Sequence, residues 1–124
     1  MNITQASEKG IDLLSKIVSE SNKDVADLFN LSIRNSPKHP SFCKPEWIQK
    51  EFERGQRYFI YSDNGMAKGC VAYEQPNENT SYLNRLSVLP EHRKKGVGSK
   101  LVNYILELSE TKGVAEVSMA SING

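Results

Sequence analysis

The sequence has little that would point to a membrane, a disulfide scaffold or a nucleic acid. Its 124 residues include only two cysteines and two histidines, and the formal net charge is +1. No apolar run approaches the roughly 20 residues of a membrane-spanning helix, and residues 1–10 lack the apolar centre of a signal peptide. A net charge this small provides no general attraction to nucleic acids or acidic membranes. We therefore expect a cytoplasmic protein that binds neither nucleic acid nor membrane.

The two cysteines, Cys43 and Cys70, lack the spacing of a metal or redox motif. We expect two reduced thiols and no metal site, with Cys70 in the core because it lies among apolar residues of strand character. Hydrophobic residues make up 38% of the chain and charged residues 25%, which is typical of a soluble globular protein. The length predicts a single domain over residues 1–124.

Residues 83–108 combine a strand, a basic glycine turn and an amphipathic helix. The segment Arg85-Leu86-Ser87-Val88 alternates, so its two apolar side chains should share one face of a strand and its two polar side chains the other. Pro90 should end the strand, because proline cannot donate to a ladder. Apolar residues then recur at helical spacing as far as a basic last turn, Lys112-Gly113. This apolar stripe consists of Val97, Leu101, Ile105 and Leu108.

The turn between this strand and this helix has the features of an anion site. Three cations, Arg93-Lys94-Lys95, precede Gly96-Val97-Gly98. The glycines allow a tight turn and the close approach of a ligand to the backbone. The helix that follows begins with unpaired N–H groups and roughly half a positive charge. The pattern therefore predicts a site for an anion, and a pyrophosphate fits it best.

Two familiar nucleotide motifs match this turn poorly. A P-loop requires Gly-Lys-Ser/Thr, whereas the chain has Gly98-Ser99-Lys100, with lysine and hydroxyl exchanged. A dinucleotide fingerprint requires a third glycine at the position of Leu101, followed by a complete βαβ unit. Neither ATP nor a dinucleotide is therefore the expected ligand.

The first half of the chain predicts helices at residues 8–20, 23–33 and 45–54, with Ser7 as an N-cap and a break at Ser21-Asn22. The second of these helices should turn the following side chains inward: Val25, Leu28, Phe29 and Ser32.

Strands are expected at residues 2–6, 57–62, 66–74, 81–89 and 114–120, and the last helix at 96–112. Asn64-Gly65 is a hairpin signal. Gly69, inside a strand, indicates a bulge or a close approach of another backbone.

The run from Arg85 to Gly98 resembles motif A of the GCN5-related N-acetyltransferases (GNATs), in which an apolar strand and a proline lead to Arg/Gln-x-x-Gly-x-Gly/Ala at a helix start. The resemblance implies an α/β fold, an α+β mixed sheet with element order β-α-α-α-β-β-β-α-β. It also implies acetyl transfer from acetyl-CoA, the co-substrate, to a primary amine of a small molecule or peptide. No metal is implied.

The family fold continues with a helix and two strands beyond the position of residues 114–120. Without them, that last strand would be an uncovered sheet edge. We expect either that this chain is part of a longer protein, or that another chain covers the edge, as in a homodimer.

The resemblance also implies which residues bind acetyl-CoA. Backbone groups of Leu86 and Val88 would bond to the pantetheine arm, and Arg93 would add charge and support the turn. The pyrophosphate would be held by the N–H groups of Lys94, Lys95, Gly96, Val97, Gly98 and Ser99.

The acid–base groups are less clear in the sequence. The family often places a carboxylate on the motif A strand, whereas this strand has Tyr82 and Asn84 on the corresponding side. Glu74, at the end of the neighbouring strand, is the third candidate. The missing carboxylate leaves an alternative open, a non-catalytic acyl-CoA-binding module of the same fold.

The acceptor site is expected within residues 22–55 and the strand that follows. Its candidate wall residues are His39, Phe42, Trp47 and Tyr58, for each of which a place in the core or in a loop anchor is the competing interpretation. His92 is expected to be a surface residue of the turn.

Overall fold

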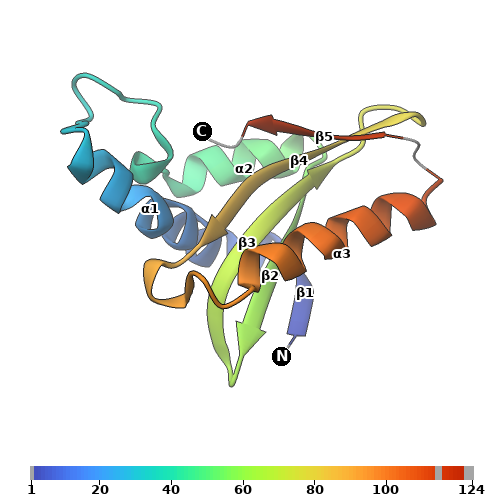
Figure 1. Ribbon diagram of the computed structural model, residues 1–124. Coiled ribbons are helices and arrows are strands. Elements are labelled where there is room, and N and C mark those ends of the chain that lie inside the picture. Colours follow the sequence, from blue (N-terminus) through green and yellow to red (C-terminus); the bar gives the residue numbers. More distant parts are fainter. Residues whose placement is uncertain (1, 114–115, 122–124) are drawn as a thin grey trace.

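The computed structural model describes residues 2–113 and 116–121, with side chains for residues 2–113. They form one five-stranded sheet in the order β1-β2-β3-β4-β5 (Figure 1). The strands are β1 (Asn2–Ala6), β2 (Arg57–Asp63), β3 (Met66–Glu74), β4 (Thr80–Val88) and β5 (Glu116–Ser121). Strands β1 to β4 pair with one another in antiparallel fashion, and β5 pairs with β4 in parallel. The expected mixed α/β sheet is confirmed.

Three α-helices cover the sheet: α1 (Ile11–Leu28), α2 (Pro45–Glu53) and α3 (Val97–Thr111). Figure 1 shows α1 and α2 on one face and α3 on the other. Short 3₁₀ turns lie at Glu8–Gly10, Pro40–Phe42 and Pro90–His92. Ser7 caps the first of these turns, and its side chain accepts a hydrogen bond from the Lys9 N–H, as expected of an N-cap residue.

The sheet separates two hydrophobic cores, because side chains of β2 alternate between its faces. Tyr58 and Ile60 pack with α1 and α2, whereas Phe59 and Tyr61 pack with α3. The first core also contains Leu14, Ile17, Val18, Ile48 and Cys70, and the second contains Val71, Tyr73, Leu83, Val97, Leu101 and Ile105. The apolar stripe and the buried Cys70 are therefore confirmed.

The predicted break at Ser21-Asn22 is wrong, because α1 continues through it to Leu28. The Asn22 amide donates to the Val18 carbonyl at 2.7 Å, so its side chain follows the helix instead of diverting the backbone. Serine and asparagine cost a helix only a few tenths of a kcal/mol relative to leucine or lysine, roughly, and the packed face of α1 outweighs that cost.

The helix ends at a Schellman motif centred on Asn30, which has φ +55°. The Leu31 N–H bonds to the Ala26 carbonyl and the Asn30 N–H to the Asp27 carbonyl. No helix therefore reaches residue 33.

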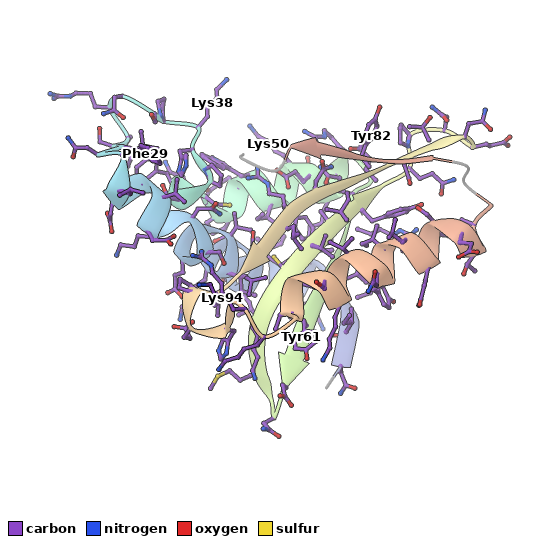
Figure 2. The ribbon with its side chains drawn as sticks, in the orientation of Figure 1. Phe29, Lys38, Lys50, Tyr61, Tyr82 and Lys94 are labelled. Atoms are coloured by element: carbon purple, nitrogen blue, oxygen red, sulfur yellow. The ribbon has the colours of Figure 1, made fainter. Side chains whose placement is uncertain are left out.

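The side chains predicted to turn inward from this segment instead face solvent. Val25, Leu28 and Phe29 are 39%, 77% and 67% exposed, and Ser32 is also exposed. Figure 2 shows Phe29 at the outer end of α1, beyond the sheet that α1 covers.

Strand β4 contains a β-bulge that the sequence did not predict. Between the pairs Asn84–Ala72 and Ser87–Cys70, β4 has one residue more than β3. Arg85, at this point, has φ +54°, a left-handed conformation that costs a non-glycine residue about 1–3 kcal/mol. The bulge shifts the alternation of β4 by one residue, so the consecutive residues Asn84 and Arg85 both reach toward the α2 side.

Gly69 allows β3, β4 and α3 to approach closely. A Cβ at this position would lie 2.7 Å from the Ser87 carbonyl oxygen and 3.3 Å from side-chain carbons of Leu101 and Val97. Lys68, beside it, is the extra residue of a bulge against β2. The expected close approach is therefore confirmed at Gly69, and a bulge lies next to it at Lys68.

The last helix ends as predicted, with Lys112 at its C-cap and Gly113 at φ +72°. Residues 114 and 115, placed by the sequence in the last strand, lie outside the described residues.

Candidate functional site

From the bulge onward, one edge of strand β4 (the open edge) has no pairing partner among the residues that the structure describes. Its pairing with β5 runs from Thr80 to Asn84, and among the described residues no β5 residue pairs with 85–88. The Leu89 N–H donates to the Lys68 carbonyl of β3 at 2.9 Å. Because backbone groups alternate between the two edges of a strand, those of Val88 and Leu86 point to the open edge. A ligand can therefore form strand-like bonds to these two residues.

The open edge leads into the glycine turn. Lys94 has φ +63° and Gly96 has φ +83°, so two left-handed residues reverse the chain before α3. A Cβ at Gly96 would meet nothing within 4 Å, which shows open space around it. The turn borders a cavity of about 250 Å³. The following residues predicted to bind the co-substrate line this cavity: Val88, Arg93, Lys94, Gly96, Val97, Gly98 and Ser99.

The start of α3 gives this cavity a positive potential. The Lys100 N–H donates to the Gly96 carbonyl at 3.0 Å, so the N–H groups before it in the first turn have no partner inside the helix. The first turn contains no acidic residue to oppose the helix dipole. Figure 2 shows Lys94 beside this end of α3. The cavity can therefore accept an anionic group such as a pyrophosphate.

The Arg93 guanidinium ties the turn to α1. Its Nη1 lies 2.6 Å from the Asp24 carboxylate, Nη2 donates to the Ser21 carbonyl, and Nε donates to the Val88 carbonyl at 3.3 Å. The hydrogen bond from Arg93, more than its charge, lowers the pKa of Asp24. Arg93 thus supports the turn, as expected, while its contribution to anion binding stays a prediction.

A buried charged cluster lies on the other side of the bulge. The Glu51 carboxylate, on α2, accepts from Arg85 Nη2 at 2.7 Å and Nε at 3.3 Å, and from the Tyr58 hydroxyl. Glu51 is only 7% exposed. Burial opposes the charge of Arg85, but the hydrogen bond and charge of Glu51 outweigh it and raise the pKa of Arg85. Burial, and then the charge of Glu51, raise the pKa of Tyr58.

Sequence reasoning missed Glu51. A signal was present, since Glu51 follows Trp47 by four residues and Ile48 by three, on the apolar side of α2. An acidic residue on that side predicts a buried partner. The guanidinium of Arg85 also lies 6.0 Å from the centre of the Trp47 ring.

Of the three acid–base candidates, only Asn84 lies at the bulge. Its amide donates to the Gln56 side chain at 3.2 Å, and Gln56 is 4% exposed. Glu74 and Tyr82 face each other near the other end of the β3–β4 pair. Figure 2 shows Tyr82 well away from Lys94 and the turn.

The four candidate wall residues of an acceptor site do not form one wall. Tyr58 is fully buried in the core. His39 caps the turn at Pro40–Phe42 by accepting from the Ser41 N–H, and its ring contacts Phe42 edge-on. Trp47 adjoins the bulge through Arg85, and Tyr58 reaches the same cluster through Glu51. His92 is partly buried and lines the cavity at the turn, so it is not a simple surface residue.

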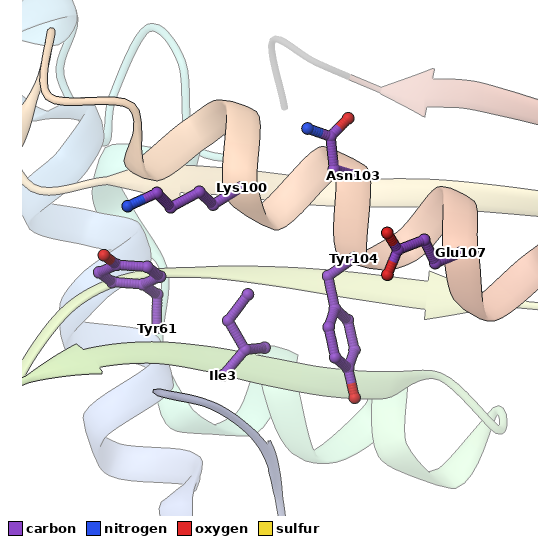
Figure 3. A pocket seen from close by; sticks show the side chains of 6 residues that line it. All are labelled: Ile3, Tyr61, Lys100, Asn103, Tyr104 and Glu107. Carbon is purple, nitrogen blue, oxygen red and sulfur yellow. The ribbon is translucent and has the colours of Figure 1, made fainter. Parts of the chain in front are cut away.

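A second cavity, of about 360 Å³, lies between α3 and the strands β1 and β2. Figure 3 shows Ile3 between Tyr61 and Tyr104, with Lys100 over the Tyr61 ring. The Lys100 ammonium lies 5.8 Å from the centre of that ring. Asn103 and Glu107 complete the rim.

Within residues 2–113 and 116–121, no helix is long and apolar enough to cross a membrane. In the same residues, no three His, Cys, Asp or Glu side chains gather as a metal site would require.

A family model described as the acetyltransferase (GNAT) family matches residues 12–123. The chain belongs to the GNAT family. The family expected from motif A is therefore confirmed over most of the chain. A search of curated proteins finds no match to this GNAT chain.

Solved structures show the same GNAT fold. A GCN5-related N-acetyltransferase from Ralstonia eutropha has a TM-score of 0.69 at 16% identity, covering 98% of this chain and 84% of that one. PaiA N-acetyltransferase from Thermoplasma acidophilum, in complex with coenzyme A, has 0.65 at 18%, covering 94% and 77%. A GNAT acetyltransferase from Brucella melitensis, in complex with acetyl-CoA, has 0.72 at 15%, covering 94% and 72%.

Proposed function

We propose that this protein is an acetyl-CoA-dependent N-acetyltransferase that acetylates a primary amine of a small molecule or peptide. The observation that carries the proposal is the open edge of β4, which leads through the glycine turn to the start of α3. A long ligand with a strand-like arm and a pyrophosphate fits that path. Two of the solved GNAT structures contain coenzyme A or acetyl-CoA, which supports the choice of ligand.

The chain provides a distinct group for each part of acetyl-CoA. The backbone of Leu86 and Val88 pairs with the amides of the pantetheine arm. The pyrophosphate accepts from the N–H groups between Lys94 and Ser99. The left-handed Gly96 and the absence of a side chain at Gly98 let the phosphates come close to the backbone. Arg93 holds the turn in place through Asp24.

The reaction is direct attack by a neutral amine on the thioester carbonyl. The new C–N bond forms, the C–S bond breaks, coenzyme A leaves as a thiolate, and the proton lost by the amine restores its thiol. The protein contributes by orienting the two substrates and by stabilising the developing oxyanion. Asn84 can position a water molecule beside the bulge, but an amide does not accept a proton at neutral pH.

The first test is a calorimetric titration of the protein with acetyl-CoA, with ATP and NAD as matched controls. We expect micromolar binding of acetyl-CoA and none of the controls. Equal binding of ATP, or no binding of acetyl-CoA, would contradict the proposal. A panel of small amines and peptides, with release of the coenzyme A thiol as the readout, then identifies the acceptor.

A second candidate function is a non-catalytic acyl-CoA-binding module. The observation that favours it is that β4 has Tyr82 and Asn84, and no carboxylate, on the side facing α2. Binding of acetyl-CoA without thiol release for any amine in the panel would support this module over the enzyme.

A further inference from the structure

We propose that Glu51 is a positioning residue for acetyl-CoA: it holds Arg85 in the left-handed bulge and thereby fixes which backbone groups of β4 face the open edge. The inference rests on the proposed function, since it concerns the strand that would bind the pantetheine arm. Glu51 itself lies behind this strand and does not contact the ligand.

The first step of the argument is the geometry of the clamp. Arg85 Nη2 donates to Glu51 Oε2 at 2.7 Å and Nε donates to Oε1 at 3.3 Å, and the buried Tyr58 hydroxyl donates to the same Oε1. A paired fork of this kind restricts the guanidinium more than a single contact does. The hydrogen bond from Tyr58 restrains the Glu51 carboxylate independently of Arg85, so the carboxylate can in turn restrain the guanidinium.

The second step is that the bulge needs a clamp. Arg85 has φ +54°, which residues with a Cβ adopt only when the surroundings hold them there. The neighbouring residue, Asn84, is held as well, because its amide donates to Gln56. Two successive residues of β4 are therefore held by side chains from the end of α2 and from the connection to β2.

The third step is the consequence for the ligand. A strand shifted by one residue turns every side chain to the opposite face and every backbone pair to the opposite edge. With the bulge in place, Leu86 and Val88 pack on the α3 side and their backbone groups face the open edge. Without it, the register with β3 past Asn84 would change, and Arg85 and Ser87 would take their places.

A double-mutant cycle tests the clamp. Glu51→Gln keeps the shape of the side chain and removes its charge. We expect it to weaken acetyl-CoA binding at least tenfold, and to increase amide hydrogen exchange of the free protein at least tenfold at Leu89, whose N–H bonds to the Lys68 carbonyl of β3. In the Arg85→Gly background, where glycine adopts this φ freely and no guanidinium is present, Glu51→Gln should change both quantities less than twofold.

The control is Glu53→Gln, two residues further along α2. Glu53 is exposed and bonds only to Gln49 among the described residues, so this variant should alter neither quantity. Thermal unfolding of each variant checks that it is folded under the conditions used.

Three results would overturn the clamp. One is unchanged hydrogen exchange at Leu89 in Glu51→Gln. Another is an equal effect of Glu51→Gln in both backgrounds, and the third is a loss of binding in Glu53→Gln of the same size. If the unaltered protein bound no acetyl-CoA, the proposed function would fall, and the exchange measurement would still decide whether Glu51 holds the bulge.

Discussion

Gly96 and Gly98 lie two residues apart in the turn, but they are needed for different reasons. Gly96 has φ +83°, so its backbone itself favours glycine. Gly98 lies inside α3, and a Cβ there would meet only a Val88 methyl at 3.7 Å, an ordinary contact. The protein alone therefore has room for a Cβ at Gly98, and the proposed pyrophosphate site would account for the glycine.

We predict that Gly98→Glu weakens acetyl-CoA binding at least tenfold, which is about 1.4 kcal/mol. The new carboxylate would occupy the position of the pyrophosphate and repel its charge. Gly98→Ala is the matched control, since its methyl group fits and alanine favours the helix. Calorimetry with acetyl-CoA measures both variants. Unaltered affinity in Gly98→Glu would show that the phosphates bind elsewhere.

The residues of the turn could be predicted from the sequence, whereas for the clamp the sequence indicates only that Glu51 needs a buried partner and does not identify Arg85 as that partner. Pro90, the basic residues and the two glycines lie within nine positions of one another, and the proline and Gly96 act through local backbone geometry. Glu51 and Arg85 are 34 positions apart, so their contact depends on how α2 lies against β4. No periodicity in either segment reports a pairing over that separation.

At the level of the elements, Gly69 lets β3, β4 and α3 approach one another closely. We predict that Gly69→Ala lowers the free energy of unfolding by about 1–3 kcal/mol, because the added methyl group would overlap the Ser87 carbonyl and two side chains of α3.

Urea unfolding measures this loss. Gly10→Ala is the control, because a Cβ at Gly10 would have only an ordinary 3.7 Å contact with the Ala6 methyl. Equal unfolding midpoints for the two variants would show that β3 can move away from α3 without cost.

The strands were easier to predict than the helices. The β-prone run Tyr58-Phe59-Ile60-Tyr61 and the Asn64-Gly65 turn located β2 and β3 to within a residue. The break expected in α1 failed because Asn22 bonds to its own helix instead of ending it. The bulge of β4 was missed because it depends on the register with β3, which the sequence of β4 alone does not contain.

For the whole molecule, the two buried thiols lower the free energy of unfolding at alkaline pH. Burial raises the pKa of Cys43 to about 11 and that of Cys70 to about 12. In the unfolded chain a thiol ionises near pH 8.5, roughly. The unfolded state therefore loses these protons first as the pH rises, and each ionisation favours unfolding.

We predict that these two thiols add no pH dependence to the free energy of unfolding below about pH 8, because they are protonated in both states there. Between about pH 8.5 and 11 it should fall by up to roughly 1.4 kcal/mol per pH unit for each thiol. Urea unfolding at a series of pH values measures the slope. Between about pH 8.5 and 10, below the range in which the tyrosines of the unfolded chain ionise, Cys70→Ala should remove about half of the slope due to the thiols, although it also lowers stability at every pH. A slope unchanged by Cys70→Ala would assign the effect to other groups.

The sheet that separates the two cores also affects which substitutions the fold can accept during evolution. Core residues on the α3 side do not touch those beneath α1 and α2, so substitutions on one side need no compensating change on the other. The α3 side borders the anion cavity, and the other side is covered by α1 and α2. Each half can therefore accumulate changes at its own rate, and the fold survives at 12–18% identity to its solved relatives.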